Sequence, residues 1–534
     1  MVYRNIATKW VYMLNGFTLF ILLSSLISCE QEKVPKRPNI LLCIADDVSF
    51  PHMGAYGTSW VKTPAFDRIA TEGVLFMNAY TPNAKCAPSR SCILTGRNSW
   101  QLEEAANHFP EFPLKFKSIM EALGENDYFT GHTAKGWAPG KARDENGERR
   151  QLTGKAYSEV KLSPPTPHIS DIDYAANFKQ FLDDRPENTP FCFWYGSLEP
   201  HRFYEFGSSL ANGRSTDEID RVFSFWPDTD SVRTDMLDYA FELEWFDKHL
   251  AAMLTTLEEL GELENTIVLV TSDNGMPFPR AKGQAYELSN HLPLAIMWKD
   301  GIKNGGRIVD DFVSFIDFAP TLLEVAQVPF DQSNMQRIEG KSLTDILFSE
   351  KQGQVNPTRN HVLIGKERHD VGRPDDQGYP IRGIVKGNYL YVKNFETDRW
   401  PSGNPETGYL NTDGGATKTV ILNMRRNGEN DEYWKYCFGK RMDEELFDLS
   451  KDRDCLTNLA LNPEHQQIVQ SLRDQMEEEL KQQGDPRMLG KGHIFDEITY
   501  TNPSNVDFYN RFKNGEKVEA NWVNATDFEK EALE

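Results

Sequence analysis

Three continuous apolar runs along the chain each end on polar residues. They are "NILLCIA" at 39–45, "FCFWYGS" at 191–197 and "TIVLVTS" at 266–272. A run of this length without polar alternation is typical of a strand that is buried on both faces of a sheet. Because helical patterns lie between the runs, we expect a mostly parallel sheet with helices packed against it.

The segments around these runs predict the rest of the fold. "TPAFDRIATEG" at 63–73 begins on Thr-Pro and ends on Gly, residues 87–95 carry Pro88 in a first turn, and residues 231–261 form one long helical pattern. From about residue 361, "GIVKGNYLYVKNF" and "ELFDL" favour short antiparallel strands, and "PEHQQIVQSLRDQMEEELKQQ" favours an amphipathic helix. The expected fold class is α/β, with a large central mixed, mostly parallel sheet flanked by helices, and a smaller C-terminal subdomain of antiparallel sheet plus helix.

The N-terminal segment is typical of an export signal. Arg4 and Lys9 precede the apolar "FTLFILLSSLIS", which ends at Cys29. The end "LISC" is similar to a bacterial lipobox, which would make 1–29 a lipoprotein-type signal peptide and place a lipid on Cys29; an uncleaved anchor helix is the alternative. Residues 30–37 are polar and contain proline, so we expect a short tether. We therefore expect an exported protein in the periplasm or at the cell surface, held by its lipid to a bacterial outer membrane.

The remaining boundaries follow from the patterns described above. We place a main domain at 38–360 and the C-terminal subdomain at 361–490, and we assign no packing to the tail at 491–534.

Lys and Arg number 58 and Asp and Glu number 80, so the net charge is −22. This balance argues against a nucleic-acid partner and means that an anionic substrate needs a local cationic pocket. Of the seven cysteines, Cys437 and Cys455 are candidates for one disulfide.

The residues that end the three apolar runs include candidate ligands. Asp46 and Asp47 follow the first run, His201 follows the second, and Asp273 and Asn274 follow the third. The carboxyl ends of strands in open α/β sheets are where ligands bind. A single Asp-Asp or "SDNG" is usually a turn, but three carboxylates and an amide oxygen at such strand ends favour Ca²⁺ or Mg²⁺ over zinc.

A short motif carries a resemblance to a known family. "CAPSRSCILTG" at 86–96 matches the signature Cys-x-Pro-Ser-Arg followed by Leu-Thr-Gly of formylglycine-dependent sulfatases, in the alkaline phosphatase superfamily. "NILLCIADD", "TPAFDRIA", "SDNG", a Lys before "YE" and "ELFDLSKDRDCLTNLA" extend the resemblance from about 38 to about 480. The resemblance implies a sulfuric ester hydrolase whose catalytic domain is 38–360.

The resemblance also implies a modified cysteine and a bound metal. In the family a maturation enzyme oxidises the cysteine to formylglycine (3-oxoalanine), so Cys86 would be modified and that enzyme would be a partner. Asp46, Asp47, Asp273 and Asn274 would hold the metal, Ca²⁺ rather than Mg²⁺, with residue 86 as a further ligand. One hydroxyl of the hydrated aldehyde attacks sulfur, and loss of the proton from the other then expels sulfate. Residue 86 would also start a helix, whose positive end favours an anion.

Four further residues match the catalytic cations of the family. Arg90, one helical turn after Cys86, would orient the diol. Lys135 in "YFTGHTAKGW" and Lys282 in "RAKGQAYE" would bind sulfate oxygens, and His201 in "EPHR" would contact the sulfate or the leaving oxygen. Cations around a metal-bound sulfate are what the charge of the transition state requires.

The chain departs from the family at one catalytic position. The family pattern at the first lysine is close to Gly-Lys-Trp-His, and its histidine helps to deprotonate the diol. This chain instead carries Gly136, Trp137 and Ala138 after Lys135. His52 in "SFPHMGAYG" and His108 in "EEAANHFP" are the candidates for a replacement base, with a structural or substrate-contacting role as the alternative for each.

The expected substrate is a sulfated polysaccharide or oligosaccharide. "SDNGMPFP", "EPHR" and "ERHDVGRPDDQGYPIRG" are most similar to the heparan N-sulfatase (sulfamidase) branch, whose bacterial relatives include O-sulfatases acting on algal polysaccharides such as ulvan. Arg368, His369 and Arg373 would pair with a uronate or a sulfate; a solvated charged loop is the alternative. Outside the sulfatases, the alternatives are a phosphatase or phosphonate hydrolase and a non-catalytic glycan-binding lipoprotein. The expected partners are the glycan, the maturation enzyme and, through the lipid anchor only, a membrane.

Overall fold

The computed structural model describes residues 36–531 and 533. The predictions for the signal segment 1–29, for Cys29 and for tether residues 30–35 therefore lie outside the described residues. Pro38–Glu534 forms one compact unit. Within the described part of the chain, no helix combines the length and the apolar character that a bilayer crossing requires.

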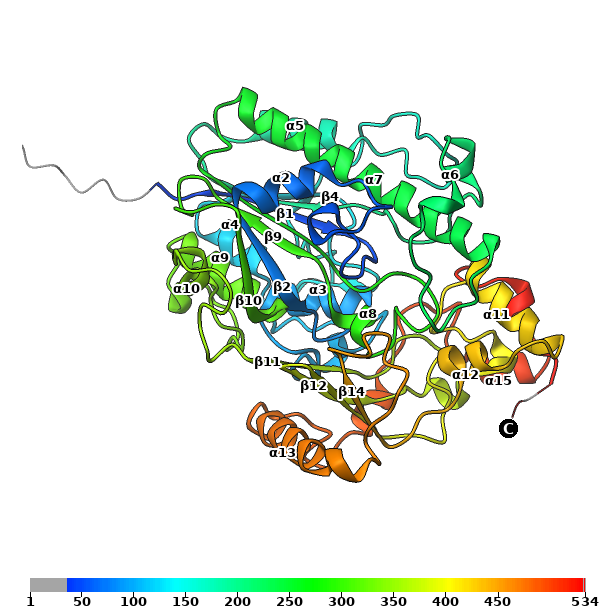
Figure 1. Ribbon diagram of the computed structural model, residues 1–534. Helices are drawn as coiled ribbons and strands as arrows, with labels where there is room; N and C mark the ends of the chain where they lie inside the picture. Colours follow the sequence, from blue (N-terminus) through cyan, green and yellow to red (C-terminus); the bar gives the residue numbers. More distant parts are fainter. Residues whose placement is uncertain (1–35, 532, 534) are drawn as a thin grey trace, which may run out of the picture. The chain divides into compact units, whose positions relative to one another are not determined.

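A central eight-stranded sheet organises this unit (Figure 1). The strand order is β10-β2-β9-β8-β1-β7-β4-β6. All the pairings are parallel except those that β9 makes with β2 and β8. The strands are β1 Asn39–Ala45, β2 Val74–Tyr80, β4 Phe129–Ala134, β6 Lys155–Ala156, β7 Phe191–Gly196, β8 Thr266–Ser272, β9 Leu294–Met297 and β10 Arg307–Ser314.

Strand β1 shows that both faces of this sheet are covered. Leu41 and Cys43 belong to one hydrophobic cluster and Ile40, Leu42 and Ile44 to another, as expected when successive side chains point to opposite faces. The first cluster contains α2 Pro64–Glu72, α5 Tyr174–Asp184 and α7 Asp230–Glu259, and the second contains α3 Cys86–Thr95, α4 Ile119–Glu125 and α9 Phe318–Val325. The continuous apolar runs therefore exist because no face of these strands meets water.

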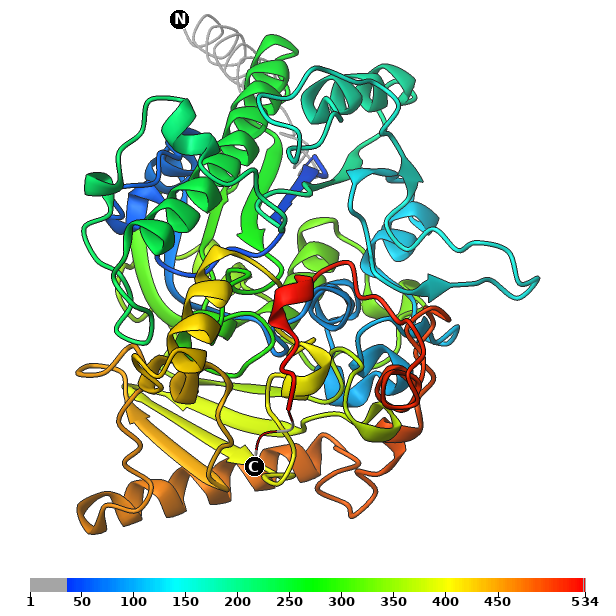
Figure 2. The same ribbon diagram turned by 90° about the vertical axis from the view of Figure 1, so that its right-hand side faces the viewer.

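A second sheet starts at His361 and is antiparallel throughout. Its order is β11-β12-β13-β14, with bounds β11 His361–Lys366, β12 Ile381–Lys386, β13 Tyr389–Asn394 and β14 Glu444–Asp448. One face packs against Tyr80, at the end of β2, and against Tyr286. The other packs against Leu472 and Met476 of α13 Gln466–Gln482, which runs along its outer side (Figure 2). The observed architecture confirms the predicted fold class.

The C-terminal segment, which the sequence left unassigned, packs onto the same unit. It carries α14 Ile494–Glu497 and α15 Phe508–Lys513, and Tyr500 and Phe508 share a small hydrophobic cluster with Val371 and Leu410. The other elements are a two-stranded parallel sheet of β3 Glu111–Phe112 and β5 Lys141–Ala142, and helices α6 Ser208–Ala211, α8 Glu287–Asn290, α10 Thr344–Leu347, α11 Ala416–Arg426 and α12 Glu432–Phe438.

The candidate disulfide does not form. Cys437 and Cys455 are both free and buried. They lie in different hydrophobic clusters, Cys437 beside the main core and Cys455 beneath the second sheet. Each sulfur instead contacts a backbone carbonyl, that of Phe225 for Cys437 and that of Arg453 for Cys455. The candidate pairing was wrong because tertiary packing places the two residues in different clusters.

Replacing Leu41 by alanine tests the two-sided burial of β1. Leu41 is fully buried, so the change removes apolar contacts and leaves a cavity. We expect the free energy of unfolding to fall by about 2–5 kcal/mol, measured by urea or thermal unfolding. The matched control is Leu461→Ala, because Leu461 is 74% exposed. A loss at Leu41 no larger than at Leu461 would contradict the proposed core.

Candidate active site

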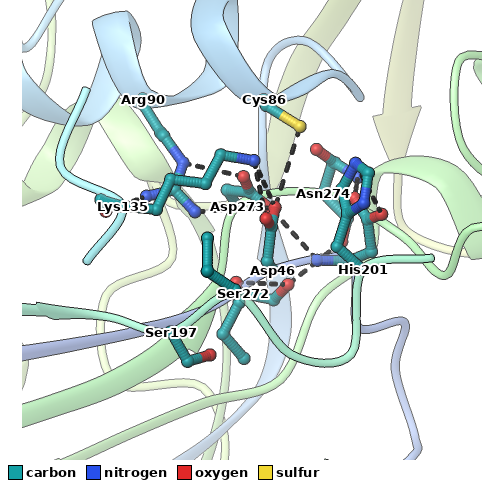
Figure 3. Close-up of polar contacts among 12 residues, drawn as sticks. Asp46, Cys86, Arg90, Lys135, Ser197, His201, Ser272, Asp273 and Asn274 are labelled. Atoms are coloured by element: carbon teal, nitrogen blue, oxygen red, sulfur yellow. Dashed lines mark hydrogen bonds and ion pairs between the residues drawn. The ribbon is translucent and has the colours of Figure 1, made fainter. Parts of the chain in front are cut away.

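Side chains from four neighbouring strands meet at one edge of the central sheet. Asp46 follows β1, Lys135 follows β4, His201 lies beyond β7, and Asp273 follows β8. These strands are parallel, so their carboxyl ends share that edge. Figure 3 shows these side chains grouped beneath the start of helix α3. The structure thus brings together the residues at the ends of all three apolar runs.

The paired aspartates face the same space because the chain turns between them. Consecutive residues of a strand would point to opposite faces. Asp47, however, has a left-handed backbone conformation with φ of 78°, which aspartate tolerates better than most residues. Its amide donates to Asp273 Oδ1 at 3.1 Å, and its Oδ1 accepts from Asn274 Nδ2 at 2.6 Å. Both carboxylates therefore belong to one site.

Cys86 is the first residue of α3. Its Sγ lies 3.7 Å from Asp46 Oδ1, and the residue is 2% exposed (Figure 3). Burial raises the pKa of the thiol to about 12, although Lys135 and Lys282 oppose the shift. A protonated thiol is a weak nucleophile. The encoded cysteine is therefore poorly suited to attack a substrate directly.

Arg90 lies one turn further along α3 and connects three parts of the site. Its Nε donates to Asp273 Oδ2 at 2.8 Å, and its Nη1 donates to the carbonyls of Lys135 and Gly136 at 2.8 and 2.9 Å. Its Nη2 lies 3.6 Å from Asp46 Oδ1. The side chain is fully buried. A planar guanidinium suits this set of acceptors, and a lysine could not replace it.

Two lysines complete the charge balance of the site. Lys135 Nζ donates to both oxygens of Asp46, at 2.8 and 2.6 Å. Lys282 Nζ donates to Asp47 at 2.7 Å and to Asp413 at 2.8 Å. Burial alone would lower the pKa of Lys135, but the Asp46 carboxylate raises it above its usual value. Burial would likewise raise the pKa of Asp46, but Lys135 and then His201 lower it. Lys135 and Asp46 are therefore both charged at neutral pH.

His201 lies at the open side of the site. Its side chain is 31% exposed, against 10% for Lys135, and its Nε2 lies 3.9 Å from Asp47 Oδ2. Its Nδ1 donates to the carbonyl of Arg202 at 2.6 Å, which fixes the ring and leaves Nε2 facing the site. A substrate approaching from solvent would meet this nitrogen first.

The two candidate replacement bases have different surroundings. His52 is 2% exposed, lies among Trp60, Phe223 and Tyr239, and has its Nδ1 3.2 Å from the Tyr239 hydroxyl. Burial lowers the pKa of His52 to about 3. These aromatic contacts favour the structural alternative for His52 over a base or a substrate contact. His108 instead binds Asp370, with 2.9 Å between Nδ1 and Oδ1.

The segment after Lys135, where the family pattern has a histidine, makes structural contacts in this chain. Trp137 Nε1 donates to Ser91 Oγ of α3 at 2.8 Å, and the carbonyl of Gly136 accepts from Arg90. Trp137 also packs edge-on against Phe112. This segment therefore supports α3 and carries no group that accepts a proton in the site.

The charged segment at 367–373 is buried, so the solvated-loop alternative is wrong. Arg368, His369 and Arg373 are each at most 2% exposed. Arg373 donates to the carbonyls of Trp400, Pro401 and Gln377, and burial lowers its pKa to about 10. Backbone carbonyls thus accept a hydrogen bond from each of its three nitrogens, which favours a structural role for Arg373 over the predicted substrate contact.

Three residues near the site escaped the sequence analysis. Asp413 lies with Asp47 and His201 in one group whose ligand atoms are within 4.8 Å of one another. Lys85, directly before Cys86, binds Asp370 at 2.7 Å. Asp413 stands in "NTDGG", which is typical of a turn, so only the fold reveals its role. The signal for Lys85 and Asp370 was available, because each adjoins a residue that the motifs had singled out.

The comparisons with known proteins agree with this geometry. A family model described as Sulfatase matches residues 38–328.

The chain belongs to the sulfatase family.

Two similar relatives are sulfatases of different named specificity. The chain is 27% identical over 504 residues to N-sulphoglucosamine sulphohydrolase of Homo sapiens, covering 86% of this chain and 93% of the relative. It is 26% identical over 511 residues to an ulvan-active sulfatase of Formosa agariphila, covering 87% and 78%. Sulfatases are sulfuric ester hydrolases, and this chain is therefore an enzyme of that class.

Solved structures share the fold. The structure of BT4656 in complex with its substrate D-Glucosamine-2-N, 6-O-disulfate has a TM-score of 0.59 at 20% identity, covering 84% of this chain and 99% of that one. The structure of Ps i-CgsB in complex with k-i-k-neocarrahexaose has a TM-score of 0.56 at 17% identity, with 86% and 98% covered.

Replacing Asp413 by asparagine tests the residue that the sequence analysis missed. The change keeps the shape but removes the negative charge beside Lys282. The loss of one charge-assisted hydrogen bond should lower kcat/KM for sulfate ester hydrolysis by about 10- to 100-fold. Asp431→Asn, at a side chain that is 59% exposed, is the matched control. Equal kinetics for the two variants would show that Asp413 has no part in the site.

Proposed function

We propose that this sulfatase removes sulfate groups from a sulfated polysaccharide or oligosaccharide after conversion of Cys86 to formylglycine. One observation carries the proposal. The modifiable cysteine begins a buried helix and faces a group of oxygen ligands and cations at the carboxyl ends of parallel strands. The pKa of the unmodified thiol adds support, because that thiol needs chemical conversion to become an effective nucleophile.

The residues of the site fit a hard divalent cation. Asp46, Asp47, Asp273 and Asn274 would hold it together with residue 86, and Ca²⁺ suits such an oxygen-rich set better than Mg²⁺. Asn274 Oδ1 is buried and has no hydrogen-bond partner within the described chain, as expected of an amide oxygen reserved for a metal. When bound, the cation would polarise a sulfate oxygen and lower the pKa of the hydroxyl on residue 86.

The formal charges of the site support the same assignment. Asp46, Asp47, Asp273 and Asp413 carry four negative charges, and Arg90, Lys135 and Lys282 carry three positive ones. One negative charge remains. A divalent cation together with a singly charged sulfate ester would neutralise the site, and a buried site needs this balance.

The protein's own cations have distinct proposed roles. Lys135 and Lys282 would turn from the carboxylates to the oxygens of the bound sulfate and stabilise its developing charge. Arg90 would keep residue 86 and Asp273 correctly oriented toward each other. His201 Nε2, at the open side, would contact the sulfate or the leaving oxygen.

The named relatives limit the substrate class. Both an N-sulphoglucosamine sulphohydrolase and an ulvan-active sulfatase match most of this chain at similar identity. We therefore propose that the substrate is a sulfated glycan. An assay with N-sulfated and O-sulfated sugars would distinguish the two substrate types.

The segment 1–29 would export the chain, Cys29 would carry the lipid, and the enzyme would act in the periplasm or at the cell surface of a bacterium. We further propose 38–360 as the catalytic domain and 361–490 as the subdomain.

Mass spectrometry of the tryptic peptide that contains Cys86 tests the modification. Conversion of the thiol to an aldehyde lowers the peptide mass by about 18 Da. We expect this loss in protein made in its own host, together with sulfate release from N-sulfated or O-sulfated oligosaccharides. A persistent thiol and glycan binding without turnover would favour the non-catalytic lipoprotein, and phosphate release alone would favour the phosphatase alternative.

Metal removal tests the proposed cation. Chelation should abolish sulfate release and lower Tm, because repulsion among the carboxylates is then less well balanced. Adding Ca²⁺ at 100 times its Kd should restore about 2.7 kcal/mol of stability. Asp273→Asn should bind Ca²⁺ more weakly and show a smaller rise in Tm. If Ca²⁺ and Mg²⁺ both leave the Tm of the chelated protein unchanged, the metal assignment fails.

A further inference from the structure

A second polar cluster adjoins the proposed sulfate site. Lys85 Nζ lies 2.7 Å from Asp370 Oδ2, and His108 Nδ1 lies 2.9 Å from Asp370 Oδ1. His369 Nε2 lies 2.7 Å from Asn83 Oδ1. The amide of Asp370 donates to the side-chain oxygen of Asn411 at 3.3 Å. Four segments that are distant in the sequence thus meet in one place.

Two connections join this cluster to the catalytic residues. Lys85 directly precedes Cys86, and Asn411 lies two residues before Asp413, which binds Lys282. Gly283 follows Lys282, and a Cβ placed there would lie 3.5 Å from His369 Nδ1 and 2.8 Å from the carbonyl oxygen of Asn411. A side chain at residue 283 would therefore collide with the backbone of Asn411 beside His369.

Three polar atoms of the cluster are buried and have no partner within the described chain. They are His108 Nε2, His369 Nδ1 and Asn411 Nδ2. The residues are 6%, 0% and 0% exposed, respectively. Buried side-chain polar atoms normally find a hydrogen-bond partner. Three such atoms beside a catalytic site indicate a ligand that supplies the partners.

The hydrogen bond that each side chain makes through its other polar atom determines whether the unpartnered atom is a donor or an acceptor. Asp370 is acceptor-only, so His108 Nδ1 carries the proton and Nε2 is an acceptor. The amide nitrogen of Asn83 donates to Ser99 and to the Ala106 carbonyl, so its oxygen faces His369; His369 Nε2 therefore carries the proton and Nδ1 is an acceptor. Asn411 offers an N–H because its oxygen already accepts from Asp370.

This pattern of two acceptors and one donor suits sugar hydroxyls. A hydroxyl both donates and accepts, whereas a carboxylate or a second sulfate only accepts. Burial lowers the pKa of His108 to about 4, although Asp370 opposes the shift, and Lys85 and Lys282 lower it further. Burial and then Lys366 and Lys85 lower the pKa of His369. Both rings are therefore neutral at neutral pH and would not attract an anion.

We propose that His108, His369 and Asn411 bind ring hydroxyls of the sulfated sugar, and that Lys85 and Asp370 position His108 for that contact. The inference rests on the proposed function and deepens it. It replaces the expectation that His369 pairs with a uronate or sulfate. Specificity for the sugar would then come from neutral hydrogen bonds, while the sulfate is recognised by the neighbouring cations.

Two conservative variants isolate the unpartnered nitrogens. His108→Asn keeps a donor near the position of Nδ1 for Asp370 but removes the acceptor at Nε2. His369→Gln keeps a donor near the position of Nε2 for Asn83 but removes the acceptor at Nδ1. His465→Asn is the matched control, since His465 Nδ1 is also without a partner but the ring packs against Tyr389 of β13. Unchanged Tm values would show that the variants fold.

The assay compares the methyl glycosides of N-sulfated and 6-O-sulfated glucosamine with analogues that lack the 3- or the 4-hydroxyl. In the wild-type enzyme, loss of a bound hydroxyl should lower kcat/KM by about 10- to 100-fold. In His108→Asn or His369→Gln, kcat/KM for the parent sugar should fall by a similar factor. For the analogue that lacks the hydroxyl bound by the replaced histidine, the substitution should cause no further fall in kcat/KM. His465→Asn should show the wild-type pattern.

Three outcomes would overturn the proposal. One is that removal of each hydroxyl lowers kcat/KM in both variants by the same factor as in the wild-type enzyme. Another is a wild-type preference for a 2-N,6-O-disulfated sugar over both monosulfated parents that either variant loses, which would mean that the pocket binds an anion. The third is failure of the matured wild-type enzyme to cleave either parent; cleavage of 4-nitrophenyl sulfate would then show that the sulfatase function stands and only this assignment fails.

The positioning role of Lys85 has a separate test. If Lys85 acts through Asp370 on His108, then Lys85→Met and His108→Asn should not be additive. The double variant should lose no more in kcat/KM on the parent sugar than the more impaired single variant. Additive losses would show that Lys85 acts independently of His108.

Discussion

Mutual neutralisation of buried charges is the constraint on which this site depends. Asp46, Asp47 and Asp273 lie together without solvent, and such a cluster is stable only when cations approach within hydrogen-bond distance. Arg90, Lys135 and Lys282 supply those cations. Each comes from a different element, so the central sheet, α3 and the loop after β8 must all be in place before the charges balance.

The same requirement explains why the C-terminal part of the chain belongs to the site. Asp413 binds Lys282 from the connection between β13 and β14 of the second sheet, and Asp370 binds Lys85 from the segment after β11. Without these carboxylates two buried lysines would lose their partners, which is costly. The second sheet and the C-terminal segment therefore support the environment of residue 86 and do not simply extend the fold.

This chain has no histidine in the segment after Lys135, where the family pattern has one. Trp137 and Gly136 stabilise α3 through Ser91 and Arg90, so the segment where the family resemblance implies a base has a supporting role in this chain. His52 is enclosed by aromatic rings, and His108 is oriented by Asp370 on the side of the proposed sugar. Asp413 and His201 form one group with Asp47, with their ligand atoms within 4.8 Å of one another, and neither belongs to the proposed metal set.

The sequence by itself determined the features that depend on neighbouring residues. The apolar runs predicted β1, β7 and β8 because strands buried on two faces need continuous apolar side chains. The motif at Cys86 and Arg90 predicted helix α3, and the strand-end rule grouped Asp46 with Asp273. Tertiary structure alone decided the environment of single charges. Asp413 joins the site and Arg373 leaves it because their partners, Lys282 and the carbonyls at 400–401, are distant in the sequence. For the same reason Cys437 and Cys455 remain free, since the energy of a buried group depends on neighbours that only the fold brings together.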